Sequence, residues 1–321
     1  MRIFYFFILI GLAFTGCTDK KEPISTLHLG STVWPGYEPL FLGQKKNIID
    51  KKSIHLVEYI SSSQTLRAFR RGQIDAAALT LYDALLLLSE GIGIKVVLVF
   101  DVSNGGDVII SQNRFLHFKD LYGKTIGLEK STMGLHVLSK ALKINDMKIG
   151  DVKIKKFEGY EHERAFEKRE LDAIVTYEPM RSRMLKEGAN EVFSSKEMPN
   201  EIIDVLIIRD EYLNKHPKQI KKLIVDWYRT LEYYKANIVE SNTFFAKRLK
   251  LDPKDVNGSF DTLILPSKEE NIKLLNEGET PFLLKVSANI EGLMFADRLI
   301  DKELPIDSLL DYDLSKLYDI K

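Results

Sequence analysis

Residues 69–83 read F-R-R-G-Q-I-D-A-A-A-L-T-L-Y-D, and residues 166–179 read F-E-K-R-E-L-D-A-I-V-T-Y-E-P. In both segments a helical stretch containing Phe passes through a polar turn into Ile or Leu, Asp and Ala, and then into an apolar strand that ends in Thr. A new helix follows each strand. The repetition predicts two lobes of similar construction, each with a strand C-terminus and a helix N-terminus at the same edge. Chance similarity between two helix–turn–strand units is the alternative.

Short apolar runs alternate with helical patterns on both sides of these segments. The pattern predicts strands at 27–33, 54–60, 76–79, 95–100, 108–111, 124–128, 152–157, 173–176 and 204–208, with helices between most of them. This order is typical of an α/β fold with mostly parallel sheets and helices on their faces. Beyond residue 210 the pattern is chiefly helical and includes a long amphipathic stretch at 218–239.

A polar, Gly-containing break, S-N-G-G-D at 103–107, separates the two similar segments. We expect the chain to cross between lobes there and again near 200–206. Lobe 1 would then comprise residues 27–104 and 205–321, and lobe 2 residues 105–204, joined by a two-strand hinge. Ligands of open α/β sheets bind at the carboxyl ends of the strands, so two facing lobes predict a binding cleft that closes by a hinge motion.

The N-terminus has the pattern of an export signal. Residues 3–14 are almost wholly apolar, and Phe14-Thr15-Gly16-Cys17 resembles a bacterial lipobox, with Phe14 where Leu is usual. The pattern predicts a signal peptide at 1–16, a lipid on Cys17, a polar tether at 17–26, and a location in the periplasm or at the cell surface, anchored to a bacterial membrane. A plain signal peptide or a buried N-terminal helix is the alternative.

Composition excludes several classes of function. Lys plus Arg and Asp plus Glu both number 46, so no basic excess favours nucleic acid. Cys17 is the only cysteine, which leaves no disulfide framework, no thiol nucleophile and no Cys-based metal site. The six histidines lack metal-ligand spacing, and G-x-S-x-G, P-loop and G-x-G-x-x-G motifs are absent. We expect no enzymatic activity, no cofactor and no metal.

Four stretches carry a family resemblance: S-T-V-W-P-G-Y-E-P-L-F-L-G at 31–43, the run 61–80, S-T-M-G at 131–134, and L-D-A-I-V-T-Y-E-P at 171–179. Over about residues 27–240 the chain resembles the NMT1/THI5-like, SsuA/TauA-like group of solute-binding proteins for nitrate, sulfonates, taurine and thiamine precursors. The resemblance implies a type II periplasmic binding protein fold and an ABC importer, with permease and ATPase subunits, as partner. Some proteins of the group act in pyrimidine synthesis with a cysteine-rich motif, which this chain lacks.

The candidate ligand-binding residues lie where predicted strands give way to loops or helices, or near the two crossings. The alternatives for them are a core aromatic role, helix capping and hinge hydrogen bonds. The predicted set is Trp34, Tyr37, Glu38, Ser61, Ser63, Thr80, Asp83, Asn104, Asp107, Ser131, Thr132, Thr176, Tyr177, Glu178 and Asp204. Asp75 and Asp172 precede their strands and are interpreted as structural turn residues at the opposite edge.

These observations predict a monomeric lipoprotein that captures a small solute and delivers it to an ABC importer. A ligand sensor that reports to a membrane signalling partner would use the same fold and is the alternative. The predicted carboxylates and aromatic residues suit a nitrogen-containing or cationic solute, and Glu178→Gln is expected to weaken its binding. The helix N-termini favour an anionic group, and a zwitterion could use both.

Overall fold

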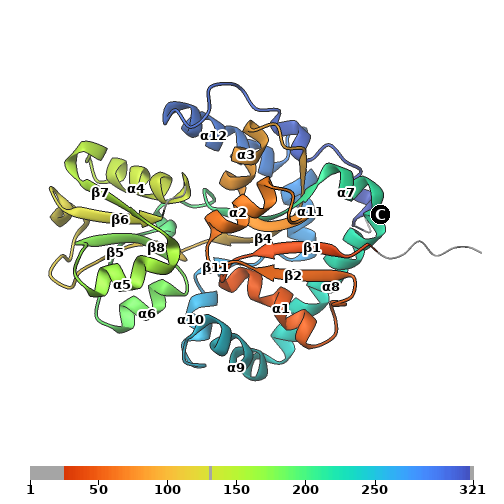
Figure 1. The fold of residues 1–321 in the computed structure, drawn as a ribbon, viewed down its shortest axis with the longest axis horizontal. Coiled ribbons are helices and arrows are strands. Elements are labelled where there is room, and N and C mark those ends of the chain that lie inside the picture. Colours follow the sequence, from red (N-terminus) through yellow and green to blue (C-terminus); the bar gives the residue numbers. More distant parts are fainter. Residues whose placement is uncertain (1–24, 130–131, 319–321) are drawn as a thin grey trace, which may run out of the picture.

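A computed structural model describes residues 25–129 and 132–318 and contains two separate β-sheets flanked by helices (Figure 1). The first sheet has six strands in the order β11-β4-β10-β3-β1-β2. Its strands are β1 (Leu27–Ser31), β2 (Ile54–Glu58), β3 (Ala76–Thr80), β4 (Ile94–Ser103), β10 (Ile203–Arg209) and β11 (Leu263–Ile264). Within the described ranges, no helix has both the length and the apolar character needed to cross a membrane.

The second sheet has five strands in the order β7-β6-β8-β5-β9. Its strands are β5 (Asp107–Ser111), β6 (Thr125–Glu129), β7 (Lys153–Phe157), β8 (Ala173–Tyr177) and β9 (Asn190–Ser194). The order β7-β6-β8-β5-β9 repeats the order β2-β1-β3-β10-β4 of the first sheet, including which neighbours are parallel. The similar construction predicted from the two sequence segments is therefore present.

Equivalent aspartates stabilise the two sheets at the edge away from the cleft. An Asp75 carboxylate oxygen accepts a hydrogen bond from the backbone N–H of His28 at 3.0 Å. An Asp172 carboxylate oxygen accepts one from the backbone N–H of Thr125, also at 3.0 Å. Both aspartates thus bind the neighbouring parallel strand, as their interpretation as structural residues predicts.

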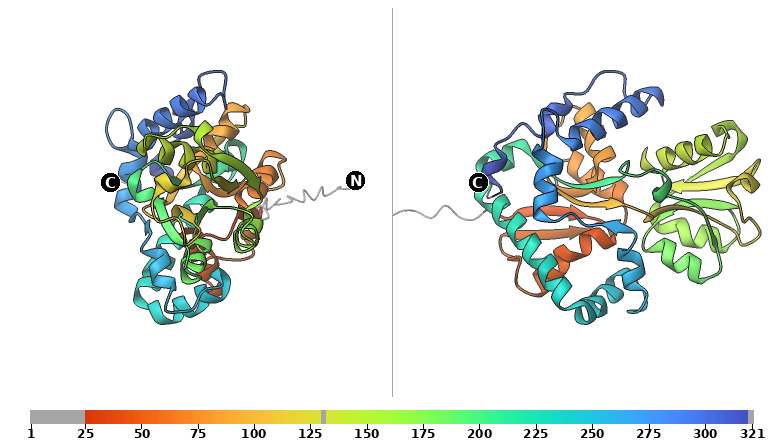
Figure 2. Two further views of the ribbon diagram at one scale, coloured as in Figure 1. Left: turned by 90° about the vertical axis from the view of Figure 1, so that its left-hand side faces the viewer. Right: turned by 180° about the vertical axis from the view of Figure 1, so that it is seen from behind.

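The prediction of mostly parallel sheets holds for most strands, since β1 to β4 share one direction in the first sheet and β6 to β9 share one in the second, but each sheet also contains at least one reversed strand. β10 is antiparallel to β3 and β4, and β5 is antiparallel to β8 and β9. The physical reason is the double crossing: β4 runs out of the first sheet directly into β5 of the second, and β10 returns in the opposite direction. Figure 2 shows this extended chain between the two halves from behind. β9 is an additional strand that the sequence pattern did not predict.

Helices cover both faces of each sheet (Figures 1 and 2). They are α1 (Glu38–Lys45), α2 (Ser62–Arg70), α3 (Leu81–Ser89), α4 (Thr132–Ile144), α5 (His162–Glu167), α6 (Met180–Lys186), α7 (Asp210–Lys215), α8 (Pro217–Ala236), α9 (Ile238–Leu249), α10 (Val256–Phe260), α11 (Lys268–Asn276) and α12 (Phe282–Ala296). The long helix predicted at 218–239 is wrong in its extent, because the helical backbone breaks at Asn237, with φ −133° and ψ 48°, between α8 and α9.

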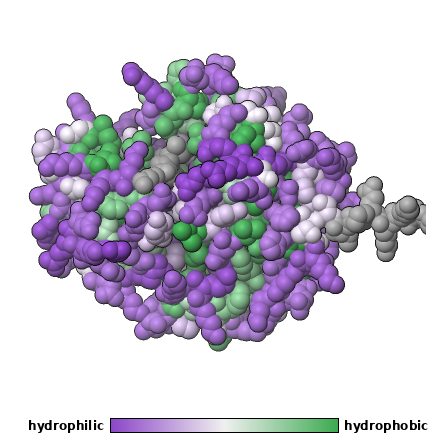
Figure 3. Space-filling model, viewed as in Figure 1, coloured by the Kyte–Doolittle hydropathy of each residue, from purple (hydrophilic) through white to green (hydrophobic). Residues whose placement is uncertain are grey.

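The cores are built from these strands and the apolar faces of the helices. In β3, β4 and β10 nearly every residue is buried, so these strands form the centre of the first half. Phe100 on β4 packs edge-on against Trp227 of α8 at a ring distance of 4.9 Å. The outer surface in the view of Figure 3 is mainly hydrophilic, with scattered apolar residues. Burial of the sheets therefore holds the strand ends, and the side chains on them, in fixed positions.

The two crossings are tied to each other by serine hydroxyls. The hydroxyls of Ser103, at the end of β4, and Ser195, after β9, lie 2.9 Å apart. The backbone N–H of Gly105 donates to the Ser195 hydroxyl at 2.6 Å. Gly105 has a φ of 114°, in the region that glycine adopts far more readily than other residues. The connection between the halves is thus a compact, hydrogen-bonded pair of segments.

Candidate ligand-binding site

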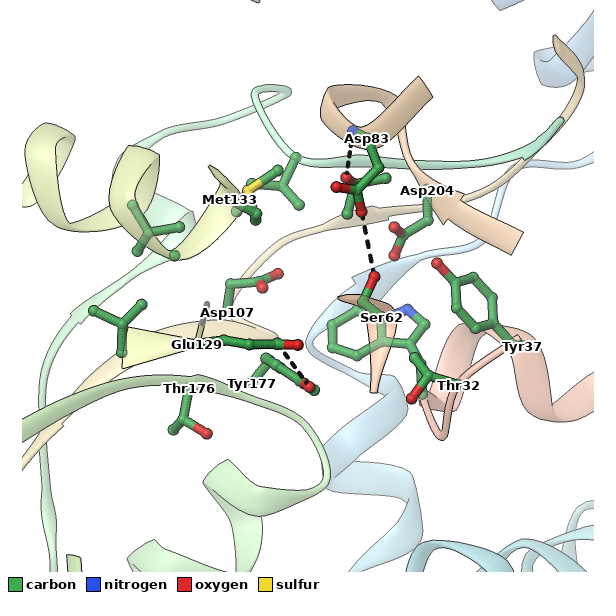
Figure 4. Close-up of a pocket in the computed structure, with 16 residues that line it drawn as sticks. Thr32, Tyr37, Ser62, Asp83, Asp107, Glu129, Met133, Thr176, Tyr177 and Asp204 are labelled. Atoms are coloured by element: carbon green, nitrogen blue, oxygen red, sulfur yellow. Dashed lines mark hydrogen bonds between the residues drawn. The ribbon is translucent and has the colours of Figure 1, made fainter. Parts of the chain in front are cut away.

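A cavity lies between the two halves at the carboxyl ends of β1, β3, β6 and β8 (Figure 4). It holds about 650 Å³ of empty space, including the part open to solvent. Its lining comes from both sheets, from the loop after β1, from the first turns of α2 and α3, and from the first two turns of α4. The lining residues are Thr32, Trp34, Tyr37, Ser62, Thr80, Asp83, Asp107, Glu129, Met133, Gly134, Val137, Val175, Thr176, Tyr177, Ile202 and Asp204.

The structure brings eight of the sequence-predicted residues together around this cavity. They are Trp34, Tyr37, Thr80, Asp83, Asp107, Thr176, Tyr177 and Asp204. They meet because equivalent strands of the two sheets end at the same cleft. Thr80 also caps α3, since its hydroxyl accepts the backbone N–H of Asp83 at 3.1 Å.

Glu38 and Glu178 do not line the cavity and have protein partners instead. The Glu38 carboxylate is fully buried against the Arg248 guanidinium, and burial raises its pKa to about 7 despite that partner. The Glu178 carboxylate accepts from Arg181 at 3.0 Å and from the Ser182 hydroxyl at 2.9 Å. Both acids follow a strand end, as the sequence indicates, but their side chains turn toward helices of their own half.

Three further predicted residues also lie outside the lining. Ser61 caps α2, because its hydroxyl accepts the backbone N–H of Gln64 at 3.3 Å. The Ser63 hydroxyl donates to Glu158 of the other half at 3.3 Å. Asn104 is a crossing residue whose backbone N–H donates to the carbonyl of Thr262 at 2.8 Å.

Some predictions fall where the structure gives no description. Ser131 and Cys17 lie outside the described residues, and so do the signal peptide at 1–16 and most of the tether at 17–26. Thr132 is the first residue of α4, but its side chain also lies outside the description.

Eight lining residues were not predicted from the sequence: Thr32, Ser62, Glu129, Met133, Gly134, Val137, Val175 and Ile202. Glu129 is the most informative of them, because it is the last residue of β6 and follows the same strand-end rule as Thr80. Extending the predicted strand at 124–128 by one residue would have found it. Met133 and Val137 are four positions apart on α4 and so share the face turned to the cavity.

Four of the lining residues are carboxylic acids: Asp83, Asp107, Glu129 and Asp204. Burial raises the pKa of Asp83 and of Asp107 to about 6 and that of Glu129 to about 7. Burial, together with the charges of Asp101 and Asp107, raises the pKa of Asp204 well above its ordinary value. None of the lining residues that the structure describes is Lys, Arg or His.

Asp101 lies directly behind the lining and holds the Trp34 side chain in place by a hydrogen bond. Asp101 and Asp204 are opposite one another on β4 and β10, and burial raises the pKa of Asp101 to about 8. The Trp34 indole N–H donates to Asp101 at 3.0 Å. Gly36 permits this contact, because a Cβ there would lie 1.8 Å from the same Asp101 oxygen.

Aromatic residues form one wall of the cavity. The rings of Trp34 and Tyr177 meet edge-on across the two halves at 6.2 Å, and the Tyr177 hydroxyl donates to Glu129 at 3.2 Å. The Tyr37 hydroxyl faces Asp204 (Figure 4). Burial lowers the pKa of the neighbouring His162 to about 4, so its imidazole is neutral at physiological pH. Among the described residues, no three His, Cys, Asp or Glu side chains are grouped as a metal site.

Residues 20–243 match the model of the NMT1-like family, so the chain belongs to that family. A protein of Brucella abortus (strain 2308) described as a binding protein is 28% identical over 180 residues, which are 54% of this chain and 55% of the relative. The chain thus spans about half the length of this relative. The taurine-binding periplasmic protein of Escherichia coli (strain K12) is 22% identical over 237 residues, 72% of each chain.

Solved structures confirm the predicted periplasmic binding protein fold. The alkanesulfonate-binding protein SsuA from Xanthomonas axonopodis pv. citri has a TM-score of 0.75 at 16% identity, covering 90% of this chain and 98% of that chain. The nitrate-binding protein NrtA from Synechocystis PCC 6803 has a TM-score of 0.69 at 14% identity, covering 90% of this chain and 85% of that chain. The proteins that the chain resembles are described as binding proteins, which agrees with the prediction that it is not an enzyme.

Proposed function

We propose that this protein is an extracytoplasmic solute-binding protein that captures a small, nitrogen-containing organic solute in the cavity. It delivers this solute to the permease and ATPase subunits of an ABC importer. The observation that carries the proposal is the cavity itself: buried polar and aromatic side chains from two sheets converge at the carboxyl ends of their strands. Relatives named for binding taurine and alkanesulfonates support the same role.

The two halves act in this proposal as lobes, residues 27–104 with 205–321 and residues 105–204, which close around the solute by bending at the two crossings. Contacts between the lobes support this motion. The Ser63 hydroxyl reaches Glu158 on one side of the cleft, and Arg183 of α6 donates to the carbonyl of Leu249 at 2.7 Å on another. Such polar contacts can form on closure and break on opening at small cost.

The nitrogen-containing class follows from the charges in the cavity. The relatives named for taurine, alkanesulfonates and nitrate bind solutes that carry an anionic group or are anions. Four carboxylic acids and no described basic side chain line this cavity. Like-charge repulsion therefore disfavours a sulfonate or nitrate here, and the acids favour a solute with nitrogen donors.

The N-terminal sequence supports export and anchoring. In our proposal the chain is cleaved before Cys17, carries a lipid on the Cys17 sulfur, and acts as a monomer in the periplasm or at the cell surface.

Thermal unfolding of the purified protein with single solutes tests the binding function. The panel holds pyrimidines, amines, betaines, taurine, alkanesulfonates and nitrate. A solute that binds only the folded state at a hundred times its Kd stabilises it by about 2.7 kcal/mol, and so raises the melting temperature. We expect a clear shift with nitrogen-containing solutes. A protein whose melting temperature no member of the panel changes would contradict the proposal.

A further inference from the structure

Three of the acids that line the cavity have a buried carboxylate oxygen without a hydrogen-bond partner in the protein. These oxygens are Oδ2 of Asp107, Oε1 of Glu129 and Oδ1 of Asp204. The three residues are 9%, 4% and 4% exposed, respectively. Buried polar atoms are almost always paired, because an unpaired one has lost the hydrogen bonds that water would make to it. Three such atoms around one cavity indicate that a bound molecule supplies the missing donors.

The donors of the cavity wall are already in use. The Trp34 indole N–H binds Asp101, the Tyr177 hydroxyl binds the second oxygen of Glu129, and the Ser62 hydroxyl binds Asp83 at 3.2 Å. The Trp34 and Tyr177 donors each satisfy one carboxylate oxygen and leave the second oxygen of Asp101 and of Glu129 without a partner. The wall is therefore rich in acceptors and short of donors.

The unpaired oxygens come from both sheets. Asp204 belongs to β10 of the first sheet, and Asp107 and Glu129 belong to β5 and β6 of the second. Asp107 and Asp204 are close enough to interact across the two sheets, since the charge of Asp107 contributes to the raised pKa of Asp204. A single small molecule between the lobes can reach acids of both sheets (Figure 4).

We propose that the solute presents a protonated nitrogen group with at least two N–H donors, such as an amine, amidine or guanidine, to carboxylates of both lobes. This inference rests on the proposed solute-binding function and names the chemical group that the cavity recognises. The charge offsets the clustered acids, and the N–H groups pair with their free oxygens. A quaternary ammonium has the charge without the donors, and a sulfonate has neither.

An aromatic cage for a quaternary ammonium is the alternative to recognition by the carboxylates, but the aromatic residues here do not form one. Such a cage presents ring faces to the cation. Here the rings of Trp34 and Tyr177 meet edge-on at 66°, and their N–H and O–H groups are directed to carboxylates. Met133, Val137 and Ile202 provide apolar surface beside the acids, which suits a hydrocarbon or ring attached to the nitrogen group.

The N-termini of α2 and α3 at the cavity do not require an anionic ligand. Asp83 lies in the first turn of α3, and the Ser62 hydroxyl in the first turn of α2 donates to the same carboxylate. The protein's own acid therefore offsets the positive ends of these two helices.

Matched pairs of probes test the proposal by thermal unfolding at pH 8. The pairs are benzamidine with benzenesulfonate, taurine with ethanesulfonate, and ethanolamine with choline, so one member of each bears N–H donors on a cationic nitrogen. We expect only such members to raise the melting temperature. A shift from benzenesulfonate, ethanesulfonate or choline that equals or exceeds its partner's would overturn this inference and leave the binding function standing. No shift with any probe would overturn both.

Two isosteric variants then test whether both lobes take part, by calorimetric titration of the probe that binds best. Asp107→Asn and Asp204→Asn should each weaken its affinity by at least about thirtyfold, because a buried charge pair loses one partner. Glu178→Gln is the matched control, since Glu178 is buried in the second half beside Arg181 and not at the cavity. The affinity of this variant for the same probe should stay within about twofold of the wild-type value. An affinity unchanged in either Asn variant, with a normal unfolding transition, would overturn the two-lobe contact.

Discussion

Replacing Asp83 with Asn measures what the cavity acids cost the protein when no solute is bound. The Asp83 side chain is 4% exposed, and burial raises its pKa from 3.8 to about 6. A folded-state pKa above the unfolded value means that folding retains a proton that the unfolded chain releases. The corresponding stability is fully present below about pH 3.8 and is lost as the pH rises through about 6.

The magnitude follows from the pKa shift. The rise of the Asp83 pKa from 3.8 to about 6 lowers the free energy of unfolding by about 3 kcal/mol at pH 8. At pH 5, where Asp83 is ionised in the unfolded chain and largely protonated in the folded one, the loss is about 1.5 kcal/mol. Asn has the size of the protonated acid and cannot ionise. Asp83→Asn should therefore raise the free energy of unfolding by up to about 3 kcal/mol at pH 8 and by about half as much at pH 5.

Thermal unfolding of the solute-free protein at the two pH values is the assay. With about 2 °C per kcal/mol for a chain of this size, the variant should melt about 6 °C above the wild type at pH 8 and about 3 °C above it at pH 5. Asp75→Asn is the control, because Asp75 binds the His28 N–H at the opposite edge and its replacement should lower the melting temperature at both pH values. An Asp83→Asn protein that melts at or below the wild-type temperature at pH 8 would refute the reasoning.

Three further predictions concern the pH dependence of binding, the fold and the anchor. Affinity for benzamidine should rise between pH 5 and pH 8, because Asp107, with a pKa of about 6, and Glu129, with a pKa of about 7, must ionise to attract a cation; calorimetric titrations that show a flat or falling affinity would contradict this. Arg248→Ala should lower the free energy of unfolding in urea by about 3 kcal/mol, because it leaves the buried Glu38 without its partner, while solute affinity stays unchanged. If Arg248→Ala also weakened solute binding by a similar free energy, the Arg248–Glu38 pair would belong to the binding mechanism. Cys17→Ser should abolish incorporation of labelled palmitate and release the protein from the membrane fraction, and a variant that stays labelled would refute the anchor.

Much of the fold could be predicted because local sequence patterns determine it. The segments at 69–83 and 166–179 predicted equivalent strands in two sheets, and the structure contains them as β3 and β8. The Gly-containing break at 103–107 likewise marks a crossing between the sheets. These features depend on apolar periodicity and turn residues within about fifteen positions of one another, which a sequence displays directly.

Strand direction and helix ends were harder to predict because they depend on distant partners. β10 reads as an ordinary buried strand, and only its return between β3 and β4 makes it antiparallel. The break at Asn237 lies inside an amphipathic pattern that continues across it, since α8 and α9 each bury an apolar face.

The same limit applies to the site. The position of Glu38 after a strand end suggested ligand contact, but its partner is Arg248, 210 positions away in the chain. Glu129 was missed because the predicted strand stopped one residue short of it. A strand-end rule thus finds the edge at which a ligand binds, while the packing of distant helices decides which acids face it.

Fluorescence of a single tryptophan tests the central claim most directly. The chain has two tryptophans, Trp34 at the cavity and Trp227 in the core, so Trp227→Phe leaves only the cavity reporter. Titration of this variant with the solute that gives the largest thermal shift should change the Trp34 emission to saturation, with the Kd found by calorimetry. A solute that binds by calorimetry but leaves the Trp34 emission unchanged would bind elsewhere and contradict the account.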